Sequence, residues 1–438
     1  MTDATAPPAR KRRGSTPWTE VLGMTSSLAI TTDPKNESAV EDDNEPEPPA
    51  FDPETPRGIS SYPLPEPGSD FPIVMVGAGN IMFGSDEGPW NHSFRFEHKL
   101  GPRLKVAALI DPNTDRARAV LADKCKSFVV SAYKDCQVYK TIDEYYAALQ
   151  AGKHTLPRAI VVGCPPAYRG GVTKGTDLEL TLIKLFPTVP YFIEKVAQSL
   201  LKNGNVVSVG YMLRYLRCVQ KMKQIIHDNN LTVMATNARY SCAYEAIAKP
   251  AWWNKAIDMG PVIEQGTHFC DLSRYFGGDV DMDSIDARAV EWYEAPGQLS
   301  KIPIDESKIP EEERIPRLTS AIWKYTNGAV GTFQHAVSLQ GDQYFCELEV
   351  WADGYLMRLT DPYNNPTLFV RRPGADVEER HHYTDDDPFF SEISTFIDAI
   401  EDGPEPNILS SFEDAAKSYE LTWAIRLASE ANKAQKPE

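Results

Sequence analysis

Two short segments combine side chains that suit acid–base chemistry. In the first, Glu264 and His268 are four positions apart and Asp271 follows three positions later, so a continuous helix would present all three on one face. A histidine held by a carboxylate suits the role of general base, because its unperturbed pKa lies near neutrality. The same spacing also suits an i,i+4 pair on a solvated helix, and the segment alone does not separate the two interpretations.

The second segment is the dipeptide Glu194-Lys195, which directly follows a short apolar run. A lysine at the carboxyl end of a strand can donate to a substrate hydroxyl or carbonyl oxygen, and its charge favours a developing oxyanion. An exposed ion pair near the start of a helix is the alternative interpretation of these two neighbours.

A glycine-rich turn follows the first apolar run of the chain. Gly77 permits a tight turn, and Gly79 allows backbone N–H groups to approach a pyrophosphate at the start of a helix. Asn80 and Ile81 then begin that helix. Met82 stands where the third glycine of a dinucleotide fingerprint is expected, so the motif is incomplete.

An acidic residue, Asp111, ends the second apolar run, where its carboxylate can accept hydrogen bonds from the ribose hydroxyls of NAD. It would repel the 2′-phosphate of NADP, although the nearby Arg116 keeps NADP open as a cofactor. The separation of Asp111 from Gly77 exceeds the usual distance of about 20 residues. We attribute the excess to a loop inserted at residues 83–91. Together these features predict a bound nicotinamide dinucleotide.

These residues need a scaffold that gathers several strand ends at one edge. Short apolar runs alternate with helical stretches, which indicates a doubly wound parallel sheet of the Rossmann type with helices on both faces. Ligands bind at the carboxyl edge of such sheets. The sequence predicts strands at 71–76, 104–110, 158–162, 191–193 and 206–209, and helices at 115–125 and 141–151.

After about residue 211 the pattern changes to long alternating strands, which predicts a large, mostly antiparallel sheet flanked by helices. Within it, Thr326-Asn327-Gly328 is expected to form a type I′ hairpin turn. The expected strands are 232–240, 285–293, 319–325, 329–336, 345–351 and 355–359, and the expected helices are 216–228, 262–276, 388–401 and 411–433.

The chain divides into three parts. Residues 1–70 are rich in Pro, Glu, Asp, Ser and Thr, and we expect a disordered acidic tail because they bury too little apolar surface to offset ordering entropy. Residues 71–210 are expected to be the dinucleotide-binding domain. Residues 211–438 are expected to form a substrate and oligomerisation domain whose final helices pack back on the first domain. The basic cluster at 10–13 is either a nuclear import signal or a solvated patch.

The amino-acid composition disfavours several classes of function. Forty-five basic against 62 acidic residues give a net charge of −17, which disfavours direct nucleic-acid binding. No apolar stretch reaches the roughly 18 residues that predict a membrane span. The seven cysteines are odd in number, and the chain starts without an apolar signal segment, which suggests reduced thiols in a cytoplasmic protein. The eight scattered histidines predict no metal site.

From about Phe71 to the C-terminus, these segments resemble the GFO/IDH/MocA family of NAD(P)-dependent oxidoreductases. The family's Glu-Lys-Pro signature appears here as Glu194-Lys195-Val196, so the proline is lost. Its Thr-Pro-x-x-x-His turn is altered to a segment that begins with Cys164.

Further segments carry the same resemblance. The family's Asp-x-Gly-x-His-x-x-Asp helix aligns with a segment containing Gly266, His268 and Asp271, and Glu264 keeps an acidic residue four positions before the histidine. The Gly-Phe-x-x-Arg segment after the fifth strand looks like residues 210–214.

The resemblance implies two domains with the nicotinamide between them. It implies that His268 takes the hydroxyl proton, that Lys195 polarises the oxygen, and that Glu264 orients the histidine. Tyr211, Arg214 and Asp271 would shape the substrate pocket. The residues implied to bind NAD are Gly77, Gly79, Asn80, Ile81, Asp111, Cys164, Pro165 and Glu194. Typical substrates of the family are sugars, inositols and other polyols, and a homodimer or homotetramer through the C-terminal sheet is expected.

Two classes of function stay open at this level. The first is an NAD(P)-dependent dehydrogenase acting on a sugar-like alcohol, which retention of Lys195, His268 and a nearby carboxylate favours. The second is a catalytically silent dinucleotide-binding regulator on the same scaffold, as some fungal transcriptional inhibitors of the family are. The acidic tail, the incomplete glycine motif and Val196 favour the regulator. An enzyme that oxidises and re-reduces one tightly held cofactor is not separable from the first class.

Overall fold

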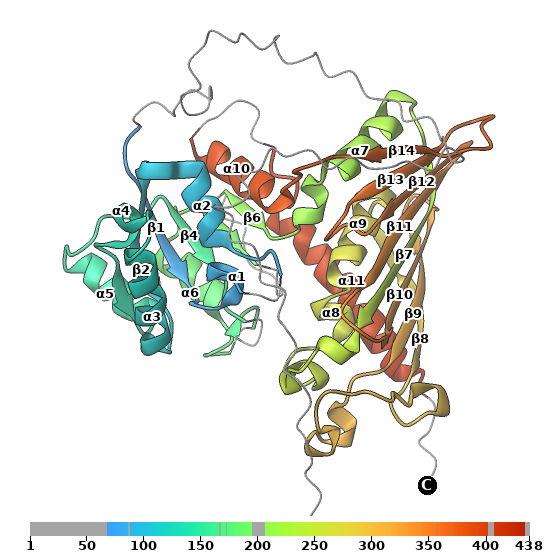
Figure 1. Cartoon of the computed structure of the whole chain (residues 1–438), viewed down its shortest axis with the longest axis horizontal. Helices are drawn as coiled ribbons and strands as arrows, with labels where there is room; N and C mark the ends of the chain where they lie inside the picture. Colours follow the sequence, from blue (N-terminus) through green and yellow to red (C-terminus); the bar gives the residue numbers. More distant parts are fainter. Residues whose placement is uncertain are drawn as a thin grey trace, which may run out of the picture.

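A parallel sheet of six strands forms the first part of the fold (Figure 1). The computed structural model gives this sheet the strand order β3-β2-β1-β4-β5-β6, which is the order of a dinucleotide-binding sheet. From edge to edge the strands are β3 (Gln137–Tyr139), β2 (Leu104–Ile110), β1 (Phe71–Val76), β4 (Ala159–Val162), β5 (Tyr191–Ile193) and β6 (Val207–Val209). The structure describes residues 68–85, 88–165, 168–171, 173–194, 206–401 and 407–433.

The central strands of this sheet are buried on both faces. All four residues of β4 and five of the six residues of β1 are buried, which explains why the sequence shows continuous apolar runs rather than alternation. The strand ranges predicted for β1, β2 and β5 are confirmed. The helices that follow these strands are α1 (Asn80–Phe83), α2 (His92–Leu100), α3 (Thr114–Cys125), α4 (Val130–Tyr133), α5 (Ile142–Gln150) and α6 (Leu178–Leu185).

The second sheet has eight strands, and only the β10–β7 pair in it is parallel. The predicted fold class, a Rossmann sheet followed by a large and mostly antiparallel sheet, is therefore confirmed. In spatial order the strands are β14 (Glu379–His382), β13 (Thr367–Arg371), β12 (Tyr355–Thr360), β11 (Phe345–Ala352), β7 (Val233–Ala243), β10 (Val330–Leu339), β9 (Leu318–Tyr325) and β8 (Val280–Val290).

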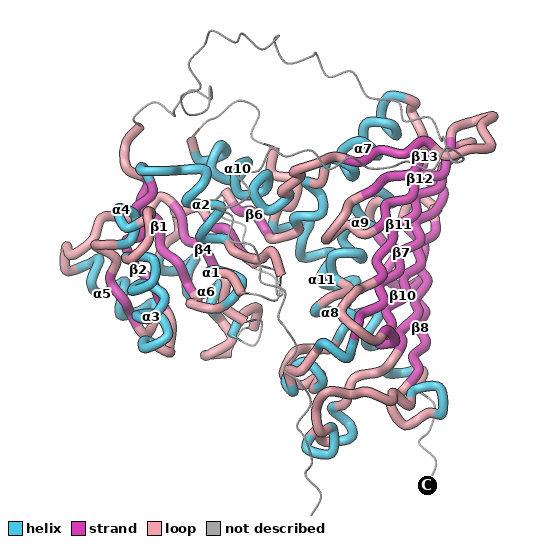
Figure 2. The backbone as a smooth tube through the Cα atoms, in the orientation of Figure 1, coloured by secondary structure: helices cyan, strands magenta, loops and turns pink. Residues whose placement is uncertain are grey.

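Helices lie against one face of the eight-stranded sheet, on the side of the first sheet (Figure 2). Their apolar side chains share one core with the inward-facing residues of the strands, such as Phe269 of a helix with Tyr240 and Leu348. The helices concerned are α7 (Arg217–Asp228), α8 (Pro261–Glu264), α9 (Thr267–Gly277) and α11 (Phe412–Ala431).

One late helix, α10 (Pro388–Ile400), packs on the first sheet rather than on the second. Its residues Ile393, Phe396 and Ile397 belong to the same buried cluster as Phe71 of β1. The C-terminal part of the chain thus contributes to the core of the dinucleotide-binding sheet, so the two sheets are joined by packing as well as by the chain.

The turn between β9 and β10 differs from the predicted type I′ hairpin. A type I′ turn needs positive φ at two successive residues, whereas here Gly328 has φ of 93° and Asn327 has no positive φ. The Asn327 side chain donates to the carbonyl of Gly277 at 2.9 Å and accepts from the N–H of Ala329 at 3.0 Å. This link to the end of α9 is a tertiary contact that the local sequence does not encode. The predicted hairpin between these strands is therefore confirmed, while its expected type I′ geometry was wrong.

The expected tail at residues 1–70 lies outside the described residues except for its last three positions. Lys195 also lies outside them. Among the helices that the structure describes, none combines the length and the apolar composition needed to cross a lipid bilayer.

Candidate active site

The glycine turn after β1 has the shape that a dinucleotide needs. Gly77 has φ of 102°, and a Cβ there would lie 3.0 Å from the backbone N of Cys164, so only glycine fits. A Cβ at Gly79 would meet no atom within 4 Å, which leaves this part of the backbone open to a pyrophosphate. Asn80 and Ile81 begin α1. Their contact with a cofactor stays a prediction.

The missing third glycine has a structural explanation. Met82 stands in its place and is fully buried. A Cβ added to Gly163, at the end of β4, would lie only 2.9 Å from the Cε of Met82. The close approach of helix and strand therefore depends here on a glycine of the neighbouring segment, so the absence of the third glycine does not prevent the fingerprint fold.

Asp111 is tied directly to the glycine turn. Its Oδ2 accepts the N–H of Ala78 at 2.7 Å, and its Oδ1 accepts the N–H of Asn113 at 2.7 Å. Each carboxylate oxygen keeps a further lone pair for a ribose hydroxyl. The structure thus brings together the predicted turn and the predicted acidic residue. The N-cap of α3 is Asn113 rather than Asp111, because Asn113 Oδ1 accepts the N–H of Arg116.

The inserted loop divides the helix that follows the glycine turn. The first piece, α1, ends at Gly84, and the second, α2, begins at His92 with the side chain of Asn91 as its N-cap. The loop therefore begins one residue later than predicted, because Phe83 belongs to α1.

Cys164 and Pro165 follow β4 at the same edge of the sheet. Burial raises the pKa of the Cys164 thiol to about 11, so the thiol is neutral at physiological pH. The carbonyl of Pro165 accepts the N–H of Tyr168. Contact of either residue with a cofactor stays a prediction.

Glu194 lies at the end of β5, where its N–H donates to the carbonyl of Val162 at 2.9 Å. Its carboxylate contacts a histidine that sequence reasoning missed, since Oε1 lies 2.6 Å from Nε2 of the fully buried His92. Its carbonyl oxygen accepts a hydrogen bond from the buried Arg169. Lys195, the next residue, lies outside the described residues, so its role stays a prediction.

His268 lies in the first turn of α9, beside the end of the first sheet. The ring of Tyr211, two residues after β6, meets the ring of His268 edge to face, with centroids 5.9 Å apart. The Tyr211 hydroxyl is 2.9 Å from the Oγ1 of Thr267, and burial raises its pKa, so it remains a neutral phenol. The ring of Tyr363 also meets the imidazole of His268 edge to face, with ring centroids 6.3 Å apart.

The continuous helix predicted to carry Glu264, His268 and Asp271 is divided in the structure, and His268 and Asp271 lie three positions apart on its second part. The chain forms two helices, because α8 ends at Glu264 and α9 begins at Thr267. Between them Gly266 packs so tightly that a Cβ would lie 2.7 Å from the Cζ of Phe333 in β10.

The carboxylate of Glu264 accepts a hydrogen bond from Trp252 Nε1 at 3.1 Å. Glu264 ends α8 and His268 lies in α9, with Gln265 and Gly266 between the two helices. An orienting role of Glu264 toward His268 stays a prediction.

Arg214 and Asp271 form a buried ion pair with each other. Arg214 Nε lies 2.7 Å from Oδ2 and Nη2 lies 2.6 Å from Oδ1 of Asp271, and both side chains are at most 3 % exposed. Ser418 donates to Oδ1 of Asp271 at 2.8 Å, and Asp414 also pairs with Arg214. These contacts join α9 to α11 and favour a structural role, while the substrate contact expected of the two residues stays a prediction.

A second histidine lies on the inner face of the large sheet. His335 of β10 stacks on Tyr240 with ring centroids 5.2 Å apart, and its Nε2 lies 2.9 Å from Oε1 of Gln265. Burial lowers the pKa of His335 to about 3, so the ring is neutral at physiological pH. Its Nε2–H therefore donates to the side-chain oxygen of Gln265, the residue before Gly266.

The buried neutral state of His335 predicts acid sensitivity. The folded pKa, about 3, lies below the unfolded value of 6.5, so stability is lost as pH falls through 6.5. At about 1.4 kcal/mol per pH unit, lowering the pH to about 5 should cost about 2 kcal/mol through this residue. Urea unfolding of wild type and His335→Gln at neutral pH and at about pH 5 measures the difference. Equal losses in the two proteins would contradict the assignment.

Two family models match consecutive parts of the chain. Residues 71–210 match the model described as oxidoreductase family, NAD-binding Rossmann fold, and residues 214–355 match that of an oxidoreductase C-terminal domain. The uncharacterized protein UNK4.17 of Schizosaccharomyces pombe is 46 % identical over 374 residues, which cover 82 % of this chain and 92 % of that protein. The chain belongs to the GFO/IDH/MocA family. It is an NAD-binding oxidoreductase of that family.

A second Schizosaccharomyces pombe protein, the uncharacterized protein C12C2.04, is 44 % identical over 371 residues, which cover 82 % of this chain and 97 % of that protein. Among solved structures of the family fold, levoglucosan dehydrogenase in complex with NADH and levoglucosan superposes with a TM-score of 0.62 at 14 % identity, covering 83 % of this chain and 98 % of that one. UDP-N-acetylglucosamine 3-dehydrogenase from Acidithiobacillus ferrooxidans gives 0.56 at 15 % identity, covering 83 % and 98 %. At these identities the likeness shows the fold.

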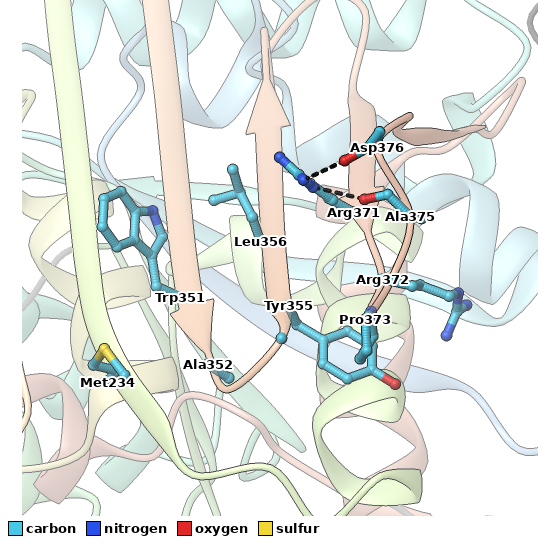
Figure 3. A pocket seen from close by; sticks show the side chains of 12 residues that line it. Met234, Trp351, Ala352, Tyr355, Leu356, Arg371, Arg372, Pro373, Ala375 and Asp376 are labelled. Atoms are coloured by element: carbon cyan, nitrogen blue, oxygen red, sulfur yellow. Dashed lines mark hydrogen bonds and ion pairs between the residues drawn. The ribbon is translucent and has the colours of Figure 1, made fainter.

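A surface hollow of about 490 Å³ lies at one end of the strands of the large sheet, where the β11–β12 turn meets the end of β13 (Figure 3). Trp351 and Met234 lie on one side of it, and Arg371 on the other is held by Asp376. The predicted site residues do not line this hollow. Among the described residues there is also no group of His, Cys, Asp and Glu that could hold a metal ion.

Proposed function

We propose that this oxidoreductase transfers a hydride between NAD and a secondary alcohol or carbonyl of a sugar- or polyol-like substrate. The solved relatives support a sugar-like substrate, since one is a levoglucosan dehydrogenase and another acts on a UDP-sugar by its name. The first domain supports NAD as the cofactor. The space beside Gly79 is open, and Asp111 is hydrogen-bonded to the glycine turn, as binding of a dinucleotide requires.

The observation that carries the proposal is the junction between the two sheets at Tyr211. This residue follows β6 of the dinucleotide-binding sheet, and its ring and hydroxyl contact His268 and Thr267 at the start of α9. An imidazole is thereby held at the carboxyl edge of the sheet, which is where ligands bind in doubly wound folds.

The roles follow from the chemistry of the side chains. His268 is the proposed base that takes the proton of the substrate hydroxyl during oxidation, and it returns the proton in the reverse direction. Lys195 is proposed to donate to the same oxygen and to stabilise negative charge on it. The nicotinamide of bound NAD supplies the hydride acceptor.

The proposal is tested by following the absorbance of reduced nicotinamide while purified protein is offered NAD with a panel of sugars, inositols and other polyols. We expect reduction of NAD with at least one member. Dinucleotide binding without reduction, and without the reverse reaction on the matching carbonyls, would contradict the proposed activity.

Replacing Asp111 with serine is expected to weaken NAD binding and to relieve the repulsion of NADP. Hydrogen bonds to a charged group contribute about 1.5–3 kcal/mol, so the preference for NAD should fall by about one to two orders of magnitude. Titration of wild type and variant with both cofactors measures this. Asp115→Ser is the matched control, because Asp115 is 96 % exposed on the adjacent helix. A wild type that already prefers NADP, or a variant with unchanged affinities for both cofactors, would contradict the role assigned to Asp111.

For assembly, we propose a homodimer or homotetramer formed through the outer face of the eight-stranded sheet. Ile322 of β9 and Phe345 and Trp351 of β11 are each 44–49 % exposed there, and exposed apolar surface of this kind marks interaction sites in soluble proteins. Sedimentation velocity of wild type beside Phe345→Glu tests this, and a wild-type monomer at micromolar concentration would contradict it.

A further inference from the structure

The side chain of Glu194 is held by a histidine from the helix after the inserted loop. His92 is fully buried, and its Nε2 lies 2.6 Å from Oε1 of Glu194 although the two are 102 positions apart. The ring of Phe192 meets the imidazole edge to face at 5.1 Å, and Phe389 of α10 lies 6.5 Å away. These rings keep the imidazole from turning away from the carboxylate.

The proton of His92 is assigned by the surroundings of its second nitrogen. Nδ1 is buried and has no hydrogen-bond partner among the described residues. A buried N–H without an acceptor is unfavourable, whereas a bare ring nitrogen is tolerated more easily. We therefore place a hydrogen on Nε2, which donates to Oε1 of Glu194.

The backbone of Glu194 is held as well. Its N–H donates to Val162 at 2.9 Å, and its carbonyl oxygen accepts from Nη1 of Arg169, which is 4 % exposed. Arg169 belongs to the altered turn after β4. Both peptide groups that flank the Cα of Glu194, including the one that leads into Lys195, are thus bonded to other segments.

Two further residues, Gly210 and Glu392, lie near the carboxylate of Glu194. A Cβ at Gly210 would lie 3.1 Å from Oε1 of Glu194, so a side chain there would press against the carboxylate. Glu392 of α10 is buried nearby, and burial, together with the charge of Glu194, raises the pKa of Glu392 well above its usual range. Burial thus favours the neutral, protonated form of Glu392.

We propose that His92 and Arg169 are positioning residues that fix the peptide between Glu194 and Lys195. A proline after the lysine restricts the backbone through its ring, and Val196 has no such ring. The two residues that hold Glu194 come from the two segments that depart from the family pattern, the inserted loop with its helix and the altered turn. The catalytic consequence rests on the proposed function, because it acts through Lys195.

The test compares His92→Leu, which fills the space without a donor, with His92→Gln, which keeps one. His98→Leu is the matched control, since His98 is exposed on the same helix. Hydrogen–deuterium exchange of peptides covering residues 189–194 measures the positioning without any substrate, because the N–H of Glu194 is bonded to Val162. We expect at least tenfold faster exchange there in His92→Leu, and exchange near the wild-type rate in the other two variants.

The effect on catalysis is measured by steady-state kinetics of the same variants. For His92→Leu we expect kcat about 10- to 100-fold lower, because small displacements of a catalytic group have effects of this size. KM and the affinity for NAD should change less than threefold, and His92→Gln should recover kcat to within about threefold. Arg169→Met should accelerate the same exchange, and it serves as the second variant if His92→Leu does not fold.

Unchanged exchange in His92→Leu and Arg169→Met would overturn the proposal. So would faster exchange with kcat equal to that of His98→Leu, because His92 would then have a structural role only. A wild type that transfers no hydride in either direction would refute the proposed function instead, and the exchange data would still decide whether His92 and Arg169 hold the segment.

Discussion

Replacing Lys195 with methionine is expected to lower kcat by about 10²–10³-fold while the protein stays folded and still binds NAD. A positioned donor to a developing oxyanion contributes about 3–4 kcal/mol to transition-state stabilisation, and methionine keeps the length of the side chain without the charge. Turnover is measured at saturating NAD and substrate, with the thermal midpoint and the NAD affinity recorded on the same preparation.

The control for this substitution is Lys126→Met. Lys126 is 76 % exposed at the end of α3 and pairs with Asp123 on the surface, so its replacement should leave kcat within about twofold of wild type. Wild-type turnover in Lys195→Met would remove the role proposed for Lys195. A parallel loss in both variants would point to a general effect of lost charge.

The second large effect is expected from Arg214→Met, which leaves the buried Asp271 without its cation. Removing one partner of a buried ion pair typically costs about 3–5 kcal/mol, because the remaining charge stays desolvated. Urea unfolding should show a loss of this size. In the double variant Arg214→Met/Asp271→Leu most of the loss should be recovered, because the pair is then replaced by apolar groups.

The pair Arg288–Asp286 is the matched surface control. Its side chains are 63 % and 57 % exposed, so Arg288→Met should change stability by less than about 1 kcal/mol. If Arg214→Met left stability unchanged and raised KM for the substrate about tenfold, the substrate role expected of Arg214 would be right and the structural role wrong.

The first sheet could be predicted well because its signals are local. Strand β1 is a buried apolar run followed at once by Gly77, and both the run and the need for glycine there are visible in the sequence. The link between Asp111 and the glycine turn also followed, since parallel strands bring their carboxyl ends to one edge.

The features that escaped prediction depend on contacts between distant segments. The break before α9 arises where Gly266 packs against Phe333, and no periodicity signals it. The asparagine at position 91 is a recognisable N-cap, which could have predicted a helix starting at His92. That His92 then meets Glu194 depends on how this helix packs against β5, which a single sequence does not encode.

An NAD-dependent dehydrogenase and a dinucleotide-binding regulator on this scaffold differ in one property, hydride transfer. A regulator on this scaffold would keep the glycine turn and Asp111, which bind the dinucleotide, but would have no need of hydride transfer. An enzyme and a regulator of this family would have the same fold and the same relatives. Only hydride transfer at Lys195 and His268 therefore distinguishes them.

The most direct test is therefore hydride transfer by the full chain, measured in both directions across the polyol and sugar panel with wild type and Lys195→Met side by side. The account predicts NAD reduction by wild type with a sugar- or polyol-like alcohol, oxidation of NADH with the matching carbonyl, and a loss of about 10²–10³-fold in the variant. Tight binding of NAD by both proteins, with transfer by neither, would contradict the enzymatic assignment and favour the regulator.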